Sequence, residues 1–434
     1  MRQGFIFNHD KCVSCNACSA ACILENGWSL QVRSIFTFNK EAESFLPVIN
    51  MSLACNHCET AVCMKGCPSS AYHRDEITGA VLIDEEKCIG CRYCLWNCPY
   101  DAPKFDKDKR IITKCNLCYT GFADGLQPSC STACPTGALS FGSLSDKAKG
   151  WIYPWFPDKN LEPAIEFTSF NNNPPLRVIP GDASPKNISV RKRQKKNIAP
   201  ELSLIIFSFL ATISVSIIAI SFLKGLYPDD YIFVPVLLAT GITSLFHLGK
   251  KLRSWRSLTN LNNSPLSREI AAFILFSVIS VLTVILHLPV LLIASAVTGL
   301  IFLLLIDSVY LFSDKSKSVL LHPGQTFISA LVIVSFLSGI LLPFLFIASV
   351  KAGLIVYQQI FNKLTKYHTN LRFMRIAFLI IPAISFILHN AHPENVIVII
   401  FLTGELFDRI LFYIDFNPVN IKSLIEEQLN NSGC

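Results

Sequence analysis

Residues 88–99, which read CIGCRYCLWNCP, constrain the fold of this chain more than any other stretch. Their four cysteines are separated by two, two and three residues, and a proline follows the last. Three thiolates so close together on a tight loop can bind three corners of one cubane iron–sulfur cluster, while the fourth points toward a neighbouring cluster. A structural zinc site is the alternative, but it uses two separated pairs of ligands. The spacing therefore favours iron.

Comparable quartets occur four times within residues 1–145, and the last three end in Cys-Pro. Their members are Cys12, Cys15, Cys18 and Cys22; Cys55, Cys58, Cys63 and Cys67; Cys88, Cys91, Cys94 and Cys98; and Cys115, Cys118, Cys130 and Cys134. Such grouped spacings favour metal ligation over disulfides. At four ligands per cubane they predict four [4Fe–4S] clusters. Cys434 is left as an isolated terminal thiol.

Short alternating segments flank these quartets and predict strands at 79–84, 110–114 and 137–144. Strands that alternate with cysteine loops and short helices are the repeat of a two-cluster ferredoxin. We therefore expect residues 1–145 to form an α+β ferredoxin-like domain with two paired 2[4Fe–4S] units. Metal–ligand bonds contribute folding free energy, so the clusters should replace much of the hydrophobic core.

The composition changes abruptly near residue 200. The chain is 51% hydrophobic and only 16% charged, whereas a soluble chain averages about 25% charged residues. Apolar runs close to the length of a membrane span, about 20 residues, lie at 202–223, 231–248, 270–288, 289–312, 326–349, 373–389 and 396–414. With the more polar stretch 351–366 as a possible eighth helix, they predict an all-α polytopic membrane domain of seven or eight helices over 201–416, followed by a polar tail at 417–434.

Residues 146–200 are rich in proline and asparagine and predict a loop-like extension that ends in the basic run VRKRQKKN. A basic run that abuts an apolar run is better explained by membrane topology than by nucleic-acid binding. Two spans separate it from a second basic loop at 250–268, so both lie on one face. The positive-inside rule then predicts a multi-pass protein of the cytoplasmic (inner) membrane, with the cysteine domain on the cytoplasmic face. The absence of a signal peptide agrees with this orientation.

The first 180 residues resemble the four-cluster iron–sulfur subunit of molybdopterin oxidoreductases, most closely that of the dimethyl sulfoxide reductase type. The resemblance rests on KCVSCNAC, SLACNHCETAVCMKGCPSSAYH, IDEEKCIGCRYCLWNCPYDAPKF and TKCNLCYTGFADGLQPSCSTACPTGALSFG. In that family the first and fourth quartets bind one pair of clusters, and the second and third bind an inserted pair.

The resemblance therefore implies four ligand sets for [4Fe–4S] clusters. They are Cys12, Cys15, Cys18 with Cys134; Cys115, Cys118, Cys130 with Cys22; Cys55, Cys58, Cys63 with Cys98; and Cys88, Cys91, Cys94 with Cys67. Because Cys91 is a cysteine, a four-iron cluster is expected in the last set, where some relatives carry three irons. The family also implies that the first-quartet cluster faces a catalytic subunit with a molybdopterin cofactor, and that the third-quartet cluster faces the membrane.

The loop after the second span, SLFHLGKKLRSWRSLTNLNNSPLSREIAAF, contains the candidate membrane site. Ionisable residues at spans are functional candidates, and quinol oxidation needs proton acceptors such as His247 and Glu269. Simple solvation of both side chains at helix ends is the structural alternative. The loop is similar to that of the dimethyl sulfoxide reductase membrane anchor, whose matching histidine and glutamate belong to a menaquinol site. That similarity favours menaquinol binding at His247, Arg253 and Glu269.

Other ionisable residues lie inside or near the spans. Glu405 and Arg409 are four residues apart on a helix and are predicted to pair. Asp307 is either part of a proton path or a packed helix-end acid. The histidines near span ends fix no facing pair, so no haem is expected; they are His287, His322, His389 and His392.

The sequence thus predicts a fused electron-transfer and menaquinol-oxidising subunit of an anaerobic respiratory reductase, which passes electrons to a separate molybdopterin subunit. Fusion would keep the first electron acceptor tethered to the quinol site at high effective concentration. The chain has no catalytic motif for a terminal substrate, so on its own it is expected to be a non-catalytic subunit. Two alternatives stay open. The module could run in reverse, from a formate or polysulfide type dehydrogenase to quinone, or it could be an anchored iron–sulfur carrier without quinone chemistry.

Overall fold

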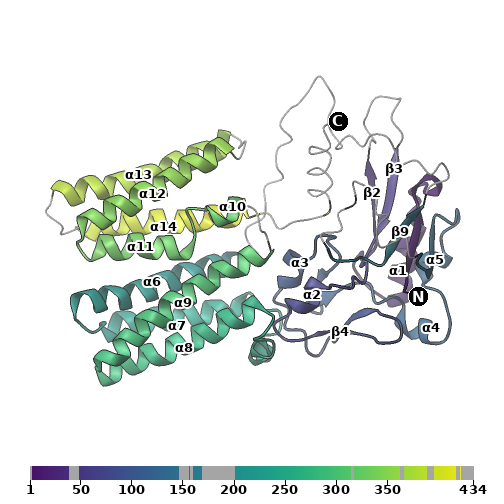
Figure 1. Ribbon diagram of the computed structural model, residues 1–434, viewed down its shortest axis with the longest axis horizontal. Coiled ribbons are helices and arrows are strands. Elements are labelled where there is room, and N and C mark those ends of the chain that lie inside the picture. Colours follow the sequence, from purple (N-terminus) through teal and green to yellow (C-terminus); the bar gives the residue numbers. More distant parts are fainter. Residues whose placement is uncertain are drawn as a thin grey trace. The chain divides into compact units, whose positions relative to one another are not determined.

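The computed structural model describes residues 2–38, 48–145, 156, 160–168, 201–313, 317–361, 366–388, 395–416 and 421. It divides into two compact units (Figure 1). The first comprises Met1–Arg193 with Pro418–Cys434, and the second comprises Gln194–Asn417. The basic run at 190–197 lies outside the described residues, as does the tail at 417–434 apart from the buried Ile421.

A three-stranded sheet brings together distant parts of the first unit. Strand β1 (Gln3–Asn8) pairs antiparallel with β8 (Leu139–Ser143) and parallel with β9 (Ile165–Thr168). The strand predicted at 137–144 is confirmed. The loop predicted for 146–200 is wrong at β9, because a four-residue strand adds to the open edge of β1 without needing a sustained hydrophobic period.

The remaining strands of this unit form three antiparallel hairpins. These are β2 (Ser34–Phe38) with β3 (Ile49–Leu53), β4 (Tyr72–Arg74) with β5 (Val81–Ile83), and β6 (Lys104–Asp106) with β7 (Ile111–Thr113). Strands β5 and β7 confirm the predictions at 79–84 and 110–114. Short helices follow or carry the cysteine loops: α1 (Ala17–Asn26), α2 (Val62–Lys65), α3 (Tyr93–Asn97), α4 (Tyr119–Ala123) and α5 (Ser129–Thr132).

The two quartets of identical spacing also fold alike. Asn16 follows the second cysteine of the first quartet, and Arg92 follows the second cysteine of the third. Both have a φ of 63°, in the left-handed region, and each is the residue just before its helix. Because residues other than glycine rarely adopt this conformation, its recurrence at equivalent positions shows that the repeat in the sequence is a repeat in the structure.

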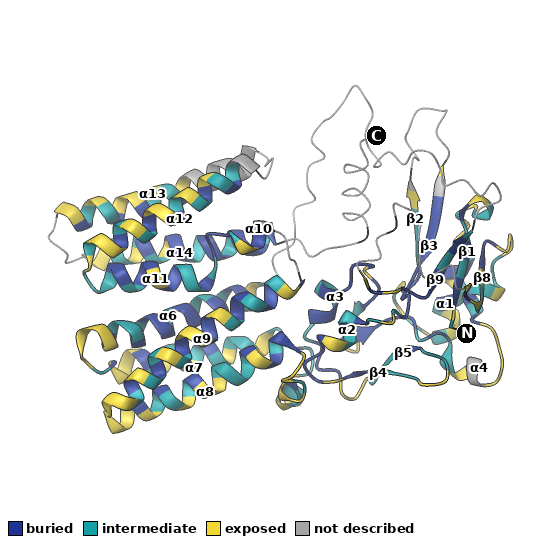
Figure 2. Ribbon diagram, in the orientation of Figure 1, coloured by how far each residue is buried: buried dark blue, intermediate teal, exposed yellow. Residues whose placement is uncertain are grey.

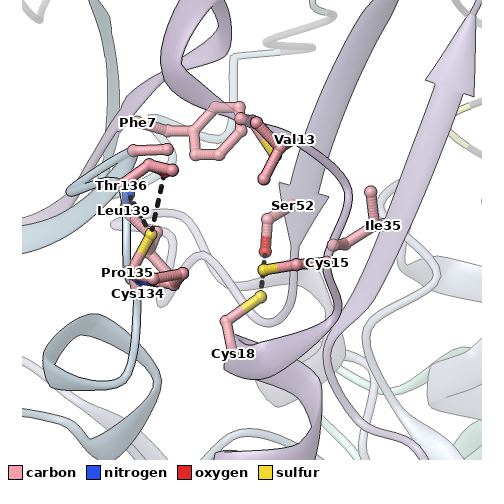
Figure 3. Close-up of a pocket in the computed structure, with 12 residues that line it drawn as sticks. Phe7, Val13, Cys15, Cys18, Ile35, Ser52, Cys134, Pro135, Thr136 and Leu139 are labelled. Atoms are coloured by element: carbon pink, nitrogen blue, oxygen red, sulfur yellow. Dashed lines mark hydrogen bonds between the residues drawn. The ribbon is translucent and has the colours of Figure 1, made fainter.

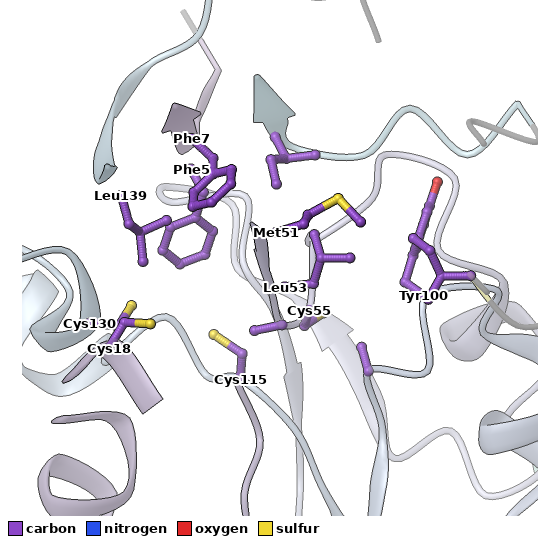
Figure 4. Packing of buried hydrophobic residues seen from close by; sticks show 14 of the residues in the cluster. Phe5, Phe7, Cys18, Met51, Leu53, Cys55, Tyr100, Cys115, Cys130 and Leu139 are labelled. Carbon is purple, nitrogen blue, oxygen red and sulfur yellow. The ribbon is translucent and has the colours of Figure 1, made fainter. Parts of the chain in front are cut away.

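Cysteines make up a large part of the core of this unit. Cys18, Cys55, Cys115 and Cys130 are buried in one cluster of side chains with Phe5, Phe7, Met51 and Leu53 (Figure 4). Cysteines thus occupy positions that larger apolar side chains fill in most cores, as expected where metal–ligand bonds supply part of the folding free energy.

The described part of the second unit contains helices and no strand. Its principal helices are α6 (Leu202–Lys224), α7 (Asp230–Phe246), α8 (Pro265–Leu286), α9 (Pro289–Ser313), α11 (Thr326–Leu337), α12 (Leu341–Phe361), α13 (Lys366–Leu388) and α14 (Asn395–Asp415). Two short segments join them, η4 (Lys251–Leu258) and α10 (Lys317–Leu320). Helices α6–α9 pack together, as do α11–α14, and α11 and α14 also contact α6.

By length and composition, four of the described helices could cross a membrane: α6, α8, α9 and the part of α12 at Leu341–Gln359. Helix α7 and η4 add a fifth if this pair, bent by 100°, is one span. Many large apolar residues on these helices are exposed, such as Ile285 and Val290. Exposed and half-buried segments recur along α7, α8 and α9 in Figure 2. Exposed apolar surface of this extent is typical of a face that contacts lipid. The expected number of seven or eight spans stays a prediction.

The single span predicted at 326–349 is wrong. Helix α11 ends at Leu337, Gly339 takes a φ of 80°, and α12 begins at Leu341. The run around the break is apolar, so hydropathy does not reveal it. Helix α12 continues to Phe361, and much of the polar stretch at 351–366 is therefore helical.

Candidate functional site

Four cysteines line one pocket in the first unit (Figure 3). Cys12, Cys15 and Cys18 come from the first quartet, whereas Cys134 comes from the last. Strand β1 leads into the first loop and β8 follows Cys134, so the pairing of these strands, with Phe7 opposite Leu139, brings the two ends of the domain together. Apolar side chains complete the wall, among them Phe7, Val13, Ile35 and Leu139.

The other cysteines gather in three further groups, each close enough for electrostatic interaction. Cys22 interacts with Cys118 and Cys130, and Cys115 interacts with Cys22 and Cys130. Cys58 interacts with Cys55, Cys63 and Cys98, and Cys94 interacts with Cys67, Cys88 and Cys91. Each group mixes two quartets, but interactions also link different groups, since Cys22 interacts with Cys18 and Cys115 interacts with Cys55. The four ligand sets that the family resemblance implies stay a prediction.

Burial makes these groups poor environments for free thiolates. It raises the pKa of Cys22 to about 12, and neighbouring thiols such as Cys130 contribute to the rise. Burial likewise raises the pKa of Cys98 to about 12. Cys134 differs, because hydrogen bonds from Leu139 and Thr136 outweigh its burial and lower its pKa. A buried group of thiolates therefore needs positive charge at its centre.

Backbone N–H groups point at the sulfurs that would bear that negative charge. Leu139 N donates to Cys134 Sγ at 3.4 Å, and Leu117 N donates to Cys115 Sγ at 3.4 Å. Ala71 N donates to Cys67 Sγ at 3.4 Å. Hydrogen bonds to cluster sulfurs are one of the features that set cluster potentials.

Two buried nitrogen-bearing side chains test whether an iron–sulfur group fits here. Arg33 lies between cysteine groups, and its Nε and Nη2 atoms have no partner among the described residues. His57 Nδ1 accepts a hydrogen bond from Val81 N at 3.0 Å, while its buried Nε2 has no described partner. A buried cation without an anion is strongly unfavourable. Anionic thiolate-ligated clusters beside Arg33 would supply that anion, so the residues fit the group.

The three residues predicted for the membrane site lie on consecutive elements of the second unit. His247 ends α7, Arg253 lies in η4, and Glu269 lies in α8 with 6% of its surface exposed. Segment η4 packs against both α7 and α8. However, the charges that act on Glu269 are those of Arg409 and Asp307. The grouping of His247, Arg253 and Glu269 into one site stays a prediction.

Arg409 is held in place by several groups of the second unit. Its Nε donates to Ser208 Oγ at 2.6 Å, and its Nη1 donates to Gly324 O at 3.0 Å. The same Nη1 lies 4.0 Å from Asp307 Oδ1. The charge of one guanidinium on α14 therefore acts on two carboxylates, Glu269 from α8 and Asp307 from α9.

Asp307 has a structural role in this geometry. Its carboxylate accepts the backbone N–H groups of Thr326 and Phe327, at 3.0 and 3.1 Å, where α11 begins. Of the two interpretations of Asp307, the contacts favour the packed acid that caps a helix.

Sequence reasoning missed a second buried group of charges. Lys351 of α12 is fully buried, and its Nζ lies 2.5 Å from Glu405 Oε2 and 2.7 Å from Asp408 Oδ2, both on α14. Arg375 of α13 also pairs with Asp408. The predicted Glu405–Arg409 pair is therefore wrong, because Glu405 binds a lysine on another helix. Two features of the sequence could have indicated this group: a lysine within an apolar run, and two acids three residues apart in GELFDR.

The remaining histidines have local roles where they are described. His322 Nδ1 accepts a hydrogen bond from Gly324 N at 2.9 Å, and its Nε2 lies 3.4 Å from Asp415 Oδ2. His287 ends α8 with a φ of 50° and its ring packs against Tyr227. His389 and His392 lie outside the described residues.

Comparisons with known proteins match both units. Residues 47–144 match the 4Fe-4S dicluster domain family, and residues 196–353 match the DMSO reductase anchor subunit (DmsC) family. The B subunit of the anaerobic dimethyl sulfoxide reductase of Haemophilus influenzae is 38% identical over 156 residues, which are 33% of this chain and 76% of that protein.

Two further relatives give the same picture. The corresponding B subunit of Escherichia coli K12 is 37% identical over 158 residues, 34% of this chain and 77% of that protein. The thiosulfate reductase electron transfer subunit PhsB of Salmonella typhi is 34% identical over 156 residues, 34% of this chain and 81% of that protein. The first unit is thus an iron–sulfur electron-transfer domain and the second is an anchor rich in apolar helices. This protein belongs to the family of iron–sulfur B subunits of anaerobic dimethyl sulfoxide reductases, here fused to a DmsC-type membrane anchor.

Proposed function

We propose that this chain oxidises menaquinol in the cytoplasmic membrane and passes the electrons, through four [4Fe–4S] clusters, to a separate catalytic subunit with a molybdopterin cofactor. The observation that carries the proposal is the pocket lined by Cys12, Cys15, Cys18 and Cys134, which joins the first and last cysteine quartets, together with neighbours from different quartets such as Cys58 with Cys98 and Cys94 with Cys67. A metal cluster explains why residues so far apart in sequence place their thiols together, with backbone donors aimed at the sulfurs.

In this proposal each group holds one cluster, which supplies a one-electron carrier. The ligand sets are Cys12, Cys15, Cys18 and Cys134; Cys22, Cys115, Cys118 and Cys130; Cys55, Cys58, Cys63 and Cys98; and Cys67, Cys88, Cys91 and Cys94. The chain's other residues exclude water from these groups and donate hydrogen bonds to the sulfurs. Both effects tune the ease of reduction.

Quinol oxidation also releases protons, and Glu269 is the proposed acceptor. Asp307 is held by two backbone N–H groups and faces Arg409. A single guanidinium balances only one of the two carboxylates, so Glu269 is the one left able to take up a proton. His247 and Arg253 would position the quinol head group from the adjoining α7 and η4. All three residues fall within the segment that matches the anchor family.

The proposed orientation of the protein in the membrane follows from the basic loops that flank the first two spans. These loops favour the cytoplasmic face for the cluster domain. The fusion keeps cluster domain and anchor on one polypeptide, so the first electron acceptor has a high effective concentration near the membrane. The Haemophilus influenzae relative is a subunit of a dimethyl sulfoxide reductase, which supports a reductase as partner.

Replacement of Glu269 with glutamine tests the proton acceptor. We expect the variant to retain all its clusters and to be reduced normally by dithionite, but to lose reduction by a menaquinol analogue. The measurement is the rate of cluster bleaching in anaerobic membranes. Asp230→Asn is the matched control, because Asp230 is an exposed acid in the first turn of α7. Bleaching of Glu269→Gln by the quinol at the normal rate would contradict the assignment.

A further inference from the structure

Arg33 is a buried cation that no cysteine motif predicts. It lies between α1, which carries Cys18 and Cys22, and the start of β2, and only 1% of its surface is exposed. The hydroxyl of Ser19 donates to its backbone carbonyl at 2.8 Å and holds this junction in place. The residue is therefore fixed both by its backbone and by the packing around its side chain.

The protein satisfies only part of the guanidinium. Its Cζ lies 4.4 Å from the centroid of the Phe5 ring. Nη1 donates to Ser52 Oγ at 3.2 Å and lies 3.4 Å from Ser52 O. Nε and Nη2 are buried and have no partner among the described residues. The guanidinium also lies beside the Cys130 thiol, where burial raises the pKa and the charge and side-chain hydrogen bond of Arg33 oppose that rise.

Cysteine thiols are the charged neighbours of the Arg33 guanidinium. The charge of Arg33 interacts with Cys18, Cys22, Cys115 and Cys130. Three of these belong to the set that also contains Cys118, and Cys18 belongs to the neighbouring set. Figure 4 shows Cys18 and Cys130 close together, with Cys115 nearby. The Cys18 thiol is linked to the same network, since its Sγ lies 3.3 Å from Ser52 Oγ. Arg33 therefore lies at the junction of two cysteine groups.

We propose that Arg33 sets the reduction potential of the cluster bound by Cys22, Cys115, Cys118 and Cys130, and holds it above that of the neighbouring cluster on Cys12, Cys15, Cys18 and Cys134. The inference rests on the proposed cluster assignment. Reduction adds one electron to the cluster, and a nearby positive charge in a medium of low polarity stabilises the reduced form. An arginine keeps its charge at every relevant pH.

Two donor atoms add to this effect. Nε and Nη2 are placed to donate hydrogen bonds to cluster or cysteine sulfurs, which also favours the reduced state. The neighbouring cluster feels Arg33 mainly through Ser52, whose hydroxyl contacts Cys18. Electrons that pass along the clusters would therefore rest on the Cys22, Cys115, Cys118 and Cys130 cluster before they move to its neighbour.

The test is a redox titration of the anaerobically purified full chain, followed by EPR. In Arg33→Met the midpoint potential of one cluster should fall while those of the inner pair stay unchanged. Arg33→Lys should lower the same midpoint by less, because a charge remains but the two extra donors are lost. Arg110→Met is the control, since Arg110 is an exposed arginine of the same domain, and it should shift no midpoint. Ser52→Ala should cause a smaller fall in both outer clusters, because Ser52 Oγ contacts both Cys18 and Arg33.

An unchanged midpoint in Arg33→Met, or an equal shift of all clusters, would overturn the proposal. If Arg33→Met fails to assemble the cluster, the midpoint potential of Arg33→Lys is the test. An unchanged midpoint in Arg33→Lys would then overturn the proposal. Failure of the underlying assignment has a different result, because the unmodified protein would then lack the signals of four [4Fe–4S] clusters.

Discussion

The two units place different groups beside their buried cations. In the cluster domain, the groups whose charge acts on the buried Arg33 are cysteines, and no ion pair with a carboxylate is found for it among the described residues. In the helical anchor, Lys351 and Arg409 are as deeply buried, yet acids, a hydroxyl and a carbonyl of the same unit bind them. The first unit thus places its buried cation beside thiols that could carry negative charge as metal ligands. The second supplies its own counter-charges.

The difference follows from what holds each unit together. A small domain with many cysteines in its core has little apolar area to bury, so metal–ligand bonds must contribute to its folding free energy. A helical anchor has ample apolar surface, but a charge inside it is unfavourable unless it is paired. Both cases obey the same rule that a buried charge needs a partner.

Removal of the clusters should cause the largest difference in folding between the two units. Anaerobic treatment with an oxidant and an iron chelator should unfold the first unit and leave the helices of the second folded. Limited proteolysis with mass spectrometry would then find new cleavage sites at 2–168 and none within α6–α9. Equal resistance of both units after iron removal would contradict a metal-dependent fold.

The next largest effect is expected at the buried lysine of the anchor. Lys351→Met leaves the carboxylate of Glu405 buried without its cation, which should lower the free energy of unfolding by about 3–5 kcal/mol. Denaturation in detergent, followed by circular dichroism, measures the change. The double variant Lys351→Met with Glu405→Gln should recover much of the loss, because Asp408 keeps Arg375. Equal stabilities of the single and double variants would show that the unpaired carboxylate of Glu405 is not the cause of the loss.

A single ligand change sharpens the assignment of the cysteine groups. In Cys91→Ser we expect an altered EPR signal for the cluster of the Cys67, Cys88, Cys91 and Cys94 set, with the other signals retained. Cys434→Ser is the control and should change no signal, since Cys434 belongs to no quartet. A normal spectrum in Cys91→Ser would remove this residue from the ligand set.

The smallest effect is expected from packing in the anchor. A Cβ at Gly404 would lie 2.6 Å from Phe378 Cβ, whereas a Cβ at Gly353 would meet nothing within 4 Å. Gly404→Ala should therefore destabilise the anchor by about 1–3 kcal/mol through overpacking. Gly353→Ala should not reduce its stability. The thermal unfolding midpoints of the two variants, measured side by side, would show whether α13 and α14 pack as closely as described.

Prediction from sequence was strongest where the spacing of residues itself limits the structure. The quartets predict the cluster domain, and the strands β5, β7 and β8 were found where alternation places them. It was weakest where the answer depends on packing between helices. Glu405 and Arg409 have the spacing of an ion pair, but Glu405 pairs with Lys351 from another helix. The break at Gly339 is hidden in a run of apolar residues. Arg33 has no motif at all, because its role depends on sulfurs from three other segments.

The central claim is tested most directly by the metal content of the protein purified anaerobically from its native membrane together with its bound partners. We expect about sixteen iron atoms per chain, from four irons in each of four clusters, and a large co-purifying subunit that contains molybdenum. About half that iron would contradict the assignment of all four cysteine groups. Full iron without any molybdenum-containing partner would contradict the reductase role and favour an anchored electron carrier.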